Sequence, residues 1–407
     1  MSIFTQWSSP SDEVQDSDES NSSSLLSQPS LPTIPSLTPP FDLPTIPAAH
    51  PNCLATLKGH SSSIFSLSLA GKNLYSGVSD GQIRVWDRNP SSYTQTSDNY
   101  PVSESRSSVK SIVVSDENLF TAHSDHKIRV WKIDNNSGQG RKHYAAVAIL
   151  PTMSDRCMSL LSAKNYVKVR RHKHCTWVHH VDAVAALAAT ADGSLLYSAS
   201  WDRSFKIWRT SDFKCVESVQ NAHDDAINAV VLSKDGHVYT GSADRRIKVW
   251  RMEGAEQKHS LVSTLEKHKS AVNALALSGD GSVLYSGACD RSIIVWERGI
   301  GGGAHMAVAG ALRGHTKAIL CLAVVGEVLC SGSADKTVRV WRRGGSGNSY
   351  SCLAVLEGHR NPVKCLAAGL DSNHVKGDVD LDDSYLIYSG SLDFEIKVWK
   401  IRVPLII

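Results

Sequence analysis

The chain has 407 residues and a nearly balanced charge, with 43 lysines and arginines against 40 acidic residues and a formal net charge of +3. A protein that binds nucleic acid usually carries a concentrated basic face, so this balance argues against direct nucleic-acid binding. No apolar run has membrane-spanning length, Met1 opens no signal-peptide pattern, and the nine cysteines include no Cys-x-x-Cys pair. We therefore expect no membrane contact and a location in the cytoplasm, the nucleus or both.

Residues 1–50 differ in composition from the rest of the chain. They hold twelve serines, eight of the fourteen prolines, six acidic residues and no lysine or arginine. Such a segment buries too little apolar surface to fold alone, so we expect a disordered tail. Ser9-Pro10 and Thr38-Pro39 are candidate phosphorylation sites, and a purely solubilising leader is the simpler interpretation.

From residue 51 to residue 402 the chain repeats one figure. A serine or threonine is followed four residues later by an aspartate, and six residues after that by a tryptophan. The seven sets are Ser76–Asp80–Trp86, Thr121–Asp125–Trp131, Ser198–Asp202–Trp208, Thr240–Asp244–Trp250, Ser286–Asp290–Trp296, Ser331–Asp335–Trp341 and Ser389–Asp393–Trp399. Six sets have a histidine 20 to 34 residues before the aspartate: His60, His180, His223, His268, His315 and His359.

The spacing of these sets indicates a fold. Four of the six intervals between successive tryptophans are 42 to 46 residues, and the residues around each set alternate as strands do. With Gly-His pairs such as Gly59-His60, the pattern resembles the WD-repeat β-propeller family over about residues 51–400. The resemblance implies an all-β fold, a seven-bladed propeller, with a hydrogen-bonded chain of Trp, Ser or Thr, His and Asp in each blade. Because buried polar groups need partners, we interpret these residues as structural, with no catalytic site among them.

The second blade departs from the pattern. Glu104 and Ser105 stand where Gly59 and His60 would match, so its network is predicted to lack the histidine. The long gap that follows predicts an insertion over about residues 132–176, with an outer strand at Ala145–Leu150 and a short helix within Pro151–Leu161.

The last blade carries a loop insertion over about residues 369–384. The ring is expected to close by pairing the first strand, Cys53–Leu57, with the last blade. The apolar end Val403–Ile407 is an alternative for that edge, and the sequence leaves the choice open.

The insertion contains a basic stretch over residues 164–174. It includes Lys168, Arg170, Arg171 and Lys173. Such a run fits an import signal, a phosphate-contacting patch or a dock for an acidic partner. Its alternation also fits a solvated edge strand whose charges discourage unwanted pairing.

Metal and cofactor sites have little support. The cluster of His172, His174, Cys175, His179 and His180 lacks paired ligand spacing, and His180 is already assigned to its blade. The acidic run from Asp378 to Asp382 lacks the later residues of a calcium loop. The glycine runs near residues 300 and 345 lack the lysine of a phosphate loop. We expect no metal and no cofactor.

A candidate partner site lies beside the turn aspartates, on the face where propellers of the WD-repeat family usually receive partners. The residue after the aspartate is a cation in four adjacent blades: Arg203, Arg245, Arg291 and Lys336. Several arginines around one rim can bind an acidic or phosphorylated segment, and solvated turn residues are the simpler interpretation. Trp201 precedes Asp202 and suits a binding hot spot.

The sequence therefore predicts a monomeric, non-catalytic scaffold for protein–protein interactions. The stretch from Lys164 to Lys173 and the run Ser200-Trp201-Asp202-Arg203-Ser204 resemble plant WD-repeat proteins of the JINGUBANG type. That resemblance implies a regulatory adaptor in signalling or in the control of transcription factors. The alternatives are a substrate receptor of a cullin-type ubiquitin ligase, for which Trp86-Asp87-Arg88 is the nearest motif, and an enzyme.

Overall fold

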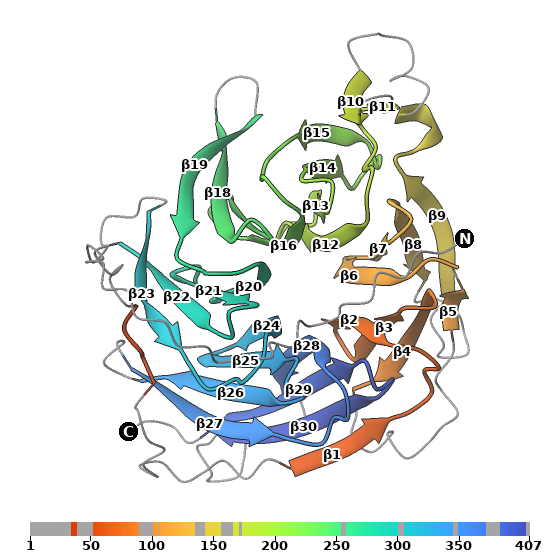
Figure 1. The fold of residues 1–407 in the computed structure, drawn as a ribbon. Coiled ribbons are helices and arrows are strands. Elements are labelled where there is room, and N and C mark those ends of the chain that lie inside the picture. Colours follow the sequence, from red (N-terminus) through yellow and green to blue (C-terminus); the bar gives the residue numbers. More distant parts are fainter. Residues whose placement is uncertain are drawn as a thin grey trace, which may run out of the picture. The chain divides into compact units, whose positions relative to one another are not determined.

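The computed structural model describes residues 34–38, 52–88, 101–104, 106–134, 143–155, 166–170, 173–253, 258–299, 305–344, 349–371 and 383–403. Residues 35–407 form one compact unit. Its strands build seven four-stranded sheets and one two-stranded hairpin. The seven sheets are arranged as the blades of a ring, so the predicted seven-bladed propeller is confirmed (Figure 1).

Each blade runs from an innermost to an outermost strand, with antiparallel neighbours. Blade one consists of β2 (Ile64–Ala70), β3 (Asn73–Val78), β4 (Gln82–Asp87) and β5 (Pro101–Glu104). Blade two consists of β6 (Val109–Ser115), β7 (Asn118–His123), β8 (Ile128–Asp134) and β9 (His143–Leu150). Blade three consists of β12 (Val184–Ala189), β13 (Leu195–Ser200), β14 (Phe205–Arg209) and β15 (Cys215–Val219). Blade four consists of β16 (Ile227–Leu232), β17 (His237–Ser242), β18 (Arg246–Glu253) and β19 (Lys258–Glu266).

The remaining three blades follow the same order. Blade five consists of β20 (Val272–Leu277), β21 (Val283–Ala288), β22 (Ile293–Arg298) and β23 (Met306–Leu312). Blade six consists of β24 (Ile319–Val325), β25 (Val328–Ser333), β26 (Val338–Arg343) and β27 (Tyr350–Leu356). Blade seven consists of β28 (Val363–Leu370), β29 (Asp383–Ser391) and β30 (Ile396–Val403), and its outermost strand is β1 (Asn52–Leu57).

The hydrophobic core lies between neighbouring blades. Phe120 and Val130 of blade two, for example, share one buried cluster with Leu187 and Trp208 of blade three. The second strand of a blade is sandwiched between its neighbours, so both of its faces need apolar or hydrogen-bonded side chains. Accordingly, every residue of β17 is buried, whereas the outermost strand β9 is mostly exposed.

The first strand closes the ring. β1 pairs antiparallel with β30, so the first of the two expected closures is the one that forms (Figure 1). β30 ends at Val403, and the competing end beyond it lies outside the described residues. One blade is thus shared between the two ends of the propeller sequence.

The structure describes only part of the predicted tail, of the insertion after blade two and of the loop in blade seven. The tail over residues 1–50 lies outside the described residues except for Ile34–Thr38, and within this segment Pro35 and Leu37 form backbone hydrogen bonds with Ala311 of β23. In the insertion, β9 forms as predicted, but the described part of the expected helix is one helical turn at residues 153–155. The acidic loop of blade seven falls mostly on residues that the structure does not describe.

The two leucines of β1 allow a test of ring closure. Leu57 is 6% exposed and packs with Ile64 and Trp86, whereas Leu54 is 36% exposed. Leu57→Ala should lower the free energy of unfolding by about 2–4 kcal/mol, because it opens a cavity at the closing seam. Leu54→Ala, as the control, should cost less than about 1 kcal/mol. Urea unfolding measures both free energies. Equal losses in the two variants would contradict the packing of Leu57 at the closing seam.

Candidate functional site

Five blades contain a complete hydrogen-bonded chain that links the Trp, Ser or Thr, His and Asp side chains of the repeated pattern. In blade four, the Trp250 indole Nε1–H donates to Thr240 Oγ1 at 2.9 Å, and His223 Nε2 lies 2.8 Å from the same hydroxyl. His223 Nδ1 then lies 2.8 Å from Asp244 Oδ2. The same chain forms around Ser198, Ser286, Ser331 and Ser389 in the other blades from three to seven.

Blade two completes its network with a histidine that the spacing did not predict. His123 Nε2 lies 2.9 Å from Thr121 Oγ1, and His123 Nδ1 lies 3.0 Å from the carbonyl oxygen of Ser107. The expectation that this blade lacks a histidine is therefore wrong, because His123 reaches the hydroxyl from the same strand, two residues after Thr121. The Asp125 carboxylate accepts two hydrogen bonds from the Arg129 guanidinium, at 2.7 and 3.2 Å.

Blade one has the histidine but not the expected contact with its aspartate. His60 Nε2 lies 2.7 Å from Ser76 Oγ, yet its buried Nδ1 has no hydrogen-bond partner among the described residues. Asp80 is exposed and accepts hydrogen bonds from Ser61 Oγ and the Gln82 N–H. Burial therefore lowers the pKa of His60 to about 4.

The turns that carry the aspartates define one face of the ring, which we call the Asp-turn face. In blades three to seven the aspartate also accepts the backbone N–H two residues later, which fixes a tight turn. The residue in between has a positive φ in all five turns: 69° at Arg203, 72° at Arg245, 69° at Arg291, 74° at Lys336 and 71° at Phe394. All four cations are exposed, and none pairs with a carboxylate in the described part of the chain.

Trp201 lies on this face, 43% exposed. The ammonium group of Lys110 lies 5.5 Å from the centre of the Trp201 ring and 4.3 Å from the centre of the Phe65 ring. These distances are within the range of cation–π contacts. We call Trp201, Lys110 and Phe65 the Trp201 cluster, which joins side chains from blades one, two and three.

Sequence reasoning missed Lys110 and Phe65, because the feature that places them appears only in the strand register. In every blade the register between the two inner strands shifts at the second residue of the innermost strand, as at Phe65 between Ile64 and Ser66 and at Lys110 between Val109 and Ser111. A β-bulge re-aims the side chain that it leaves unpaired. Lys364 occupies the matching bulge of blade seven.

The charge on Lys110 is poorly compensated. Burial and the neighbouring charge of Lys364 lower the pKa of Lys110 to about 8. Among the described residues no carboxylate pairs with Lys110. The Asp-turn face therefore offers an exposed aromatic ring beside cations that lack anionic partners.

The basic stretch forms a separate hairpin outside the blades. β10 (Tyr166–Arg170) pairs antiparallel with β11 (Lys173–Thr176), and neither strand joins a four-stranded sheet. Lys168 lies opposite His174, and Arg170 lies opposite Lys173, whereas Arg171 lies outside the described residues. The hairpin lies beyond β15 in Figure 1. Its strands therefore do not form the outer edge of a blade.

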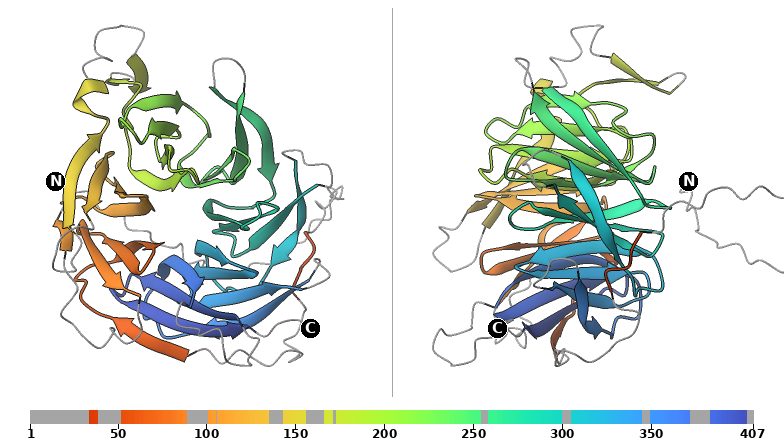
Figure 2. Two further views of the ribbon diagram at one scale, coloured as in Figure 1. Left: turned by 180° about the vertical axis from the view of Figure 1, so that it is seen from behind. Right: turned by 90° about the vertical axis from the view of Figure 1, so that its left-hand side faces the viewer.

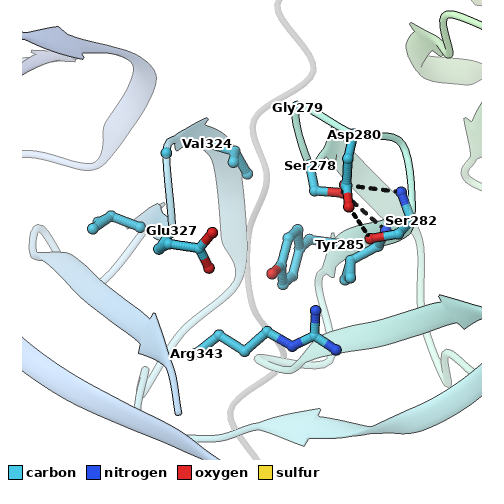
Figure 3. A pocket seen from close by; sticks show the side chains of 11 residues that line it. Ser278, Gly279, Asp280, Ser282, Tyr285, Val324, Glu327 and Arg343 are labelled. Atoms are coloured by element: carbon cyan, nitrogen blue, oxygen red, sulfur yellow. Dashed lines mark hydrogen bonds between the residues drawn. The ribbon is translucent and has the colours of Figure 1, made fainter. Parts of the chain in front are cut away.

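A recess of about 290 Å³ lies between blades five and six, at the turns opposite to the Asp-turn face (Figure 3). Three of its polar side chains are already engaged: Asp280 accepts from Ser278 and Ser282, Tyr285 contacts the Tyr350 hydroxyl at 3.0 Å, and Arg343 pairs with Glu297. Glu327 also lines the recess and forms no ion pair among the described residues. We find no reaction-competent arrangement in this recess.

The described residues contain neither a group of metal ligands nor a membrane-spanning helix. No group of three or more His, Cys, Asp or Glu side chains is arranged to hold a metal ion there. The described residues also include no apolar helix of membrane-spanning length.

Comparison with known proteins gives a family match. The family described as WD domain, G-beta repeat matches residues 51–87, 172–209, 213–251, 259–297, 307–342 and 350–400. The solved WD40 β-propeller domain of Doa1 superposes with a TM-score of 0.60 over 86% of this chain and 97% of that domain, at 20% identity. The matched segments omit blade two, whose histidine comes from an unusual position.

Curated relatives match over short stretches. An uncharacterized WD repeat-containing protein of Schizosaccharomyces pombe is 31% identical over 20% of this chain and 15% of its own length. The WD repeat domain-containing protein 83 homolog of Dictyostelium discoideum is 27% identical over 26% of this chain and 35% of its own length. Nuclear distribution protein nudF of Emericella nidulans is 35% identical over 21% and 19%. The chain thus matches about a third or less of each relative.

The aspartates of blades four and one form a matched pair for mutation. Asp244→Ala should lower the free energy of unfolding by about 2–4 kcal/mol, because it leaves the buried His223 Nδ1 without a partner. Asp80→Ala should cost less than about 1 kcal/mol, because the exposed Asp80 does not contact His60. Chemical unfolding measures both losses, and similar values would show that the histidine contact contributes little.

Because the histidines of blades one and two are buried in their neutral form, we expect the protein to lose stability in mild acid. Burial lowers the pKa of both His60 and His123 to about 4, below the unfolded value of 6.5. Their contribution is therefore complete above pH 6.5 and is lost as the pH falls toward 4. Each histidine should account for about 2–3 kcal/mol of the difference in unfolding free energy between pH 7 and pH 4.5.

The double variant His60→Gln, His123→Gln tests this origin. Its free energy of unfolding should change less between the two pH values than that of the wild type. Replacement of the exposed His143 by glutamine is the control and should leave the wild-type difference in place. An unchanged difference in the double variant would assign the acid sensitivity to other groups.

Proposed function

Because the chain belongs to the WD-repeat family, whose propellers generally act as protein-interaction scaffolds, we propose that it is a non-catalytic regulatory adaptor that binds partner proteins through its Asp-turn face. The ring supplies a rigid support, since its turns are fixed by partly buried hydrogen bonds. Regulation of signalling or of transcription factors in the cytoplasm or nucleus of a plant cell is the setting that the sequence resemblance favours.

The observation that carries this proposal is the exposed Trp201 ring beside Lys110. Large aromatic side chains with an exposed face and a nearby cation are typical binding hot spots, because they bury much area with little loss of conformational freedom. A soluble chain gains little from leaving 43% of a tryptophan in water. A partner side chain that covers Trp201 would also shield Lys110.

The charges on the same face favour an acidic or phosphorylated partner segment. Arg203, Arg245, Arg291 and Lys336 follow one another around blades three to six, and Lys110 adds a partly buried cation near the axis. Carboxylates or phosphates bind arginine through paired, charge-assisted hydrogen bonds. The basic hairpin β10–β11 is a second candidate dock for an acidic partner or for the import machinery.

The cullin-receptor alternative finds less support in the contacts of its motif. The Arg88 guanidinium donates to the carbonyl oxygens of Gly71 and Leu370, at 2.9 and 3.1 Å. Because Arg88 joins the turns of blades one and seven in this way, its guanidinium is already used within the ring. We therefore favour the adaptor over the ligase receptor.

Quantitative affinity purification from native tissue tests the proposal. The triple variant Trp201→Ala, Arg203→Glu, Arg245→Glu should lose a discrete set of co-purified proteins, at least about tenfold for the direct partner, which corresponds to about 1.4 kcal/mol. The control is Leu261→Ala, because Leu261 is 48% exposed on the outer strand β19. Both variants should keep the wild-type melting temperature.

If the triple variant co-purifies the same proteins as the wild type, the proposal that partners bind the Asp-turn face is wrong. The same experiment would then be repeated with Lys168→Glu and Arg170→Glu, which lie in the hairpin. Loss of a cullin adaptor from the triple variant alone would instead support the ligase receptor.

A further inference from the structure

A short piece of the N-terminal tail adds to the free edge of blade five. The Leu37 N–H donates to the carbonyl oxygen of Ala311, and the Ala311 N–H donates to the carbonyl oxygen of Pro35, both at 2.9 Å. Ser36 and Ala311 form a parallel bridge, so the tail extends the sheet beyond its outermost strand β23. The Tyr350 N–H of blade six donates to the carbonyl oxygen of Leu37 at 3.0 Å, which ties the segment to both blades (Figures 1 and 2).

Leu37 anchors this segment in apolar surroundings. Its side chain packs against the buried cluster that blades five and six share, which includes Val283, Trp341 and Tyr350. Gly310 makes the close approach possible, because a Cβ atom there would lie 2.5 Å from Leu37 Cγ and 2.9 Å from the carbonyl oxygen of Pro35. We call this site, formed by Gly310, Ala311 and Tyr350 with the cluster beneath them, the flank groove.

The segment itself shows what the groove accepts. Pro35 contributes only a carbonyl oxygen, so its missing N–H costs no bond, and its ring favours an extended chain. Ser36 is exposed and points its hydroxyl back toward Thr38. The selective position is therefore the leucine, two residues after the proline. The tail carries this tripeptide twice, as Pro29-Ser30-Leu31 and as Pro35-Ser36-Leu37.

We propose that the flank groove is a docking site for an extended, uncharged partner segment with a leucine two residues after a proline, and that Pro35–Leu37 fills it in the free protein. Strand addition supplies main-chain hydrogen bonds for affinity, and the leucine contact supplies selectivity. The tail thus acts as a tethered competitor that a partner displaces. The flank groove lies on the outermost strand of blade five, away from the Asp-turn face. The two binding proposals can therefore be tested independently.

The tether sets the expected size of the competition. About a dozen residues join Thr38 to β1, and a tether of this length corresponds to an effective concentration of about 1 mM. A segment that binds an open groove with a Kd of about 0.1 mM would then bind the wild type about tenfold more weakly. The second tripeptide at residues 29–31 can replace the first, so both leucines must be changed to open the groove.

The test uses the full-length chain and a fluorescent peptide with the sequence of residues 33–40, followed by anisotropy. The double variant Leu31→Ser, Leu37→Ser should bind the peptide about tenfold more tightly than the wild type. Adding Gly310→Ala to the double variant should abolish that gain, because the new methyl group occupies the leucine position. The control is addition of Gly279→Ala, since a Cβ at Gly279 has no atom within 4 Å.

A second readout separates docking from misfolding. The three atoms nearest to a Cβ at Gly310 all belong to the tail, so the ring should fold normally with alanine there once the tail has left. Hydrogen exchange of the Ala311 and Tyr350 amides should be slow in the wild type and faster in the double variant. The proposal is overturned if the double variant binds no tighter than the wild type, or if Gly310→Ala leaves its binding unchanged.

Discussion

The buried hydroxyl on the second strand of each blade is the contact on which the rest of this ring depends. It accepts the indole N–H from the third strand and, in every blade, meets a histidine nitrogen. In five blades that histidine comes from the entering loop and binds the turn aspartate, so one hydroxyl joins two strands, a loop and a turn. The exposed residue after the aspartate is therefore positioned by a partly buried carboxylate that the histidine holds in place.

The sequence predicted the blades because their pattern is local. The serine or threonine, the aspartate and the tryptophan lie on one hairpin, with the aspartate 4 residues after the hydroxyl and the tryptophan 6 residues after the aspartate. Their relative positions therefore do not depend on contacts with distant parts of the chain. The histidines were less predictable, since they approach from a separate segment. His123 reached Thr121 from its own strand, and Asp80 stayed in solvent although its spacing matches the other blades. Spacing places a residue near a site but does not fix which hydrogen bond it makes.

The candidate binding surfaces depend on contacts between blades, which explains why only part of each surface could be predicted from the sequence. Trp201 and the four turn cations stand next to a recognisable aspartate and could be named in advance. Lys110 and Phe65 belong to other blades, and only the bulge in each innermost strand brings them to Trp201. The docking of Leu37 joins residues more than 270 positions apart, at a glycine that looks ordinary in sequence.

Closure of the ring by β1 has a consequence for the order in which the protein is made. Its partner β30 begins at Ile396, so the first strand emerges from the ribosome and waits until the last blade has been synthesised. At about 5–20 residues per second, that wait lasts roughly 20–70 s. Throughout this time β1 presents an unpaired edge, which is a site for wrong pairing.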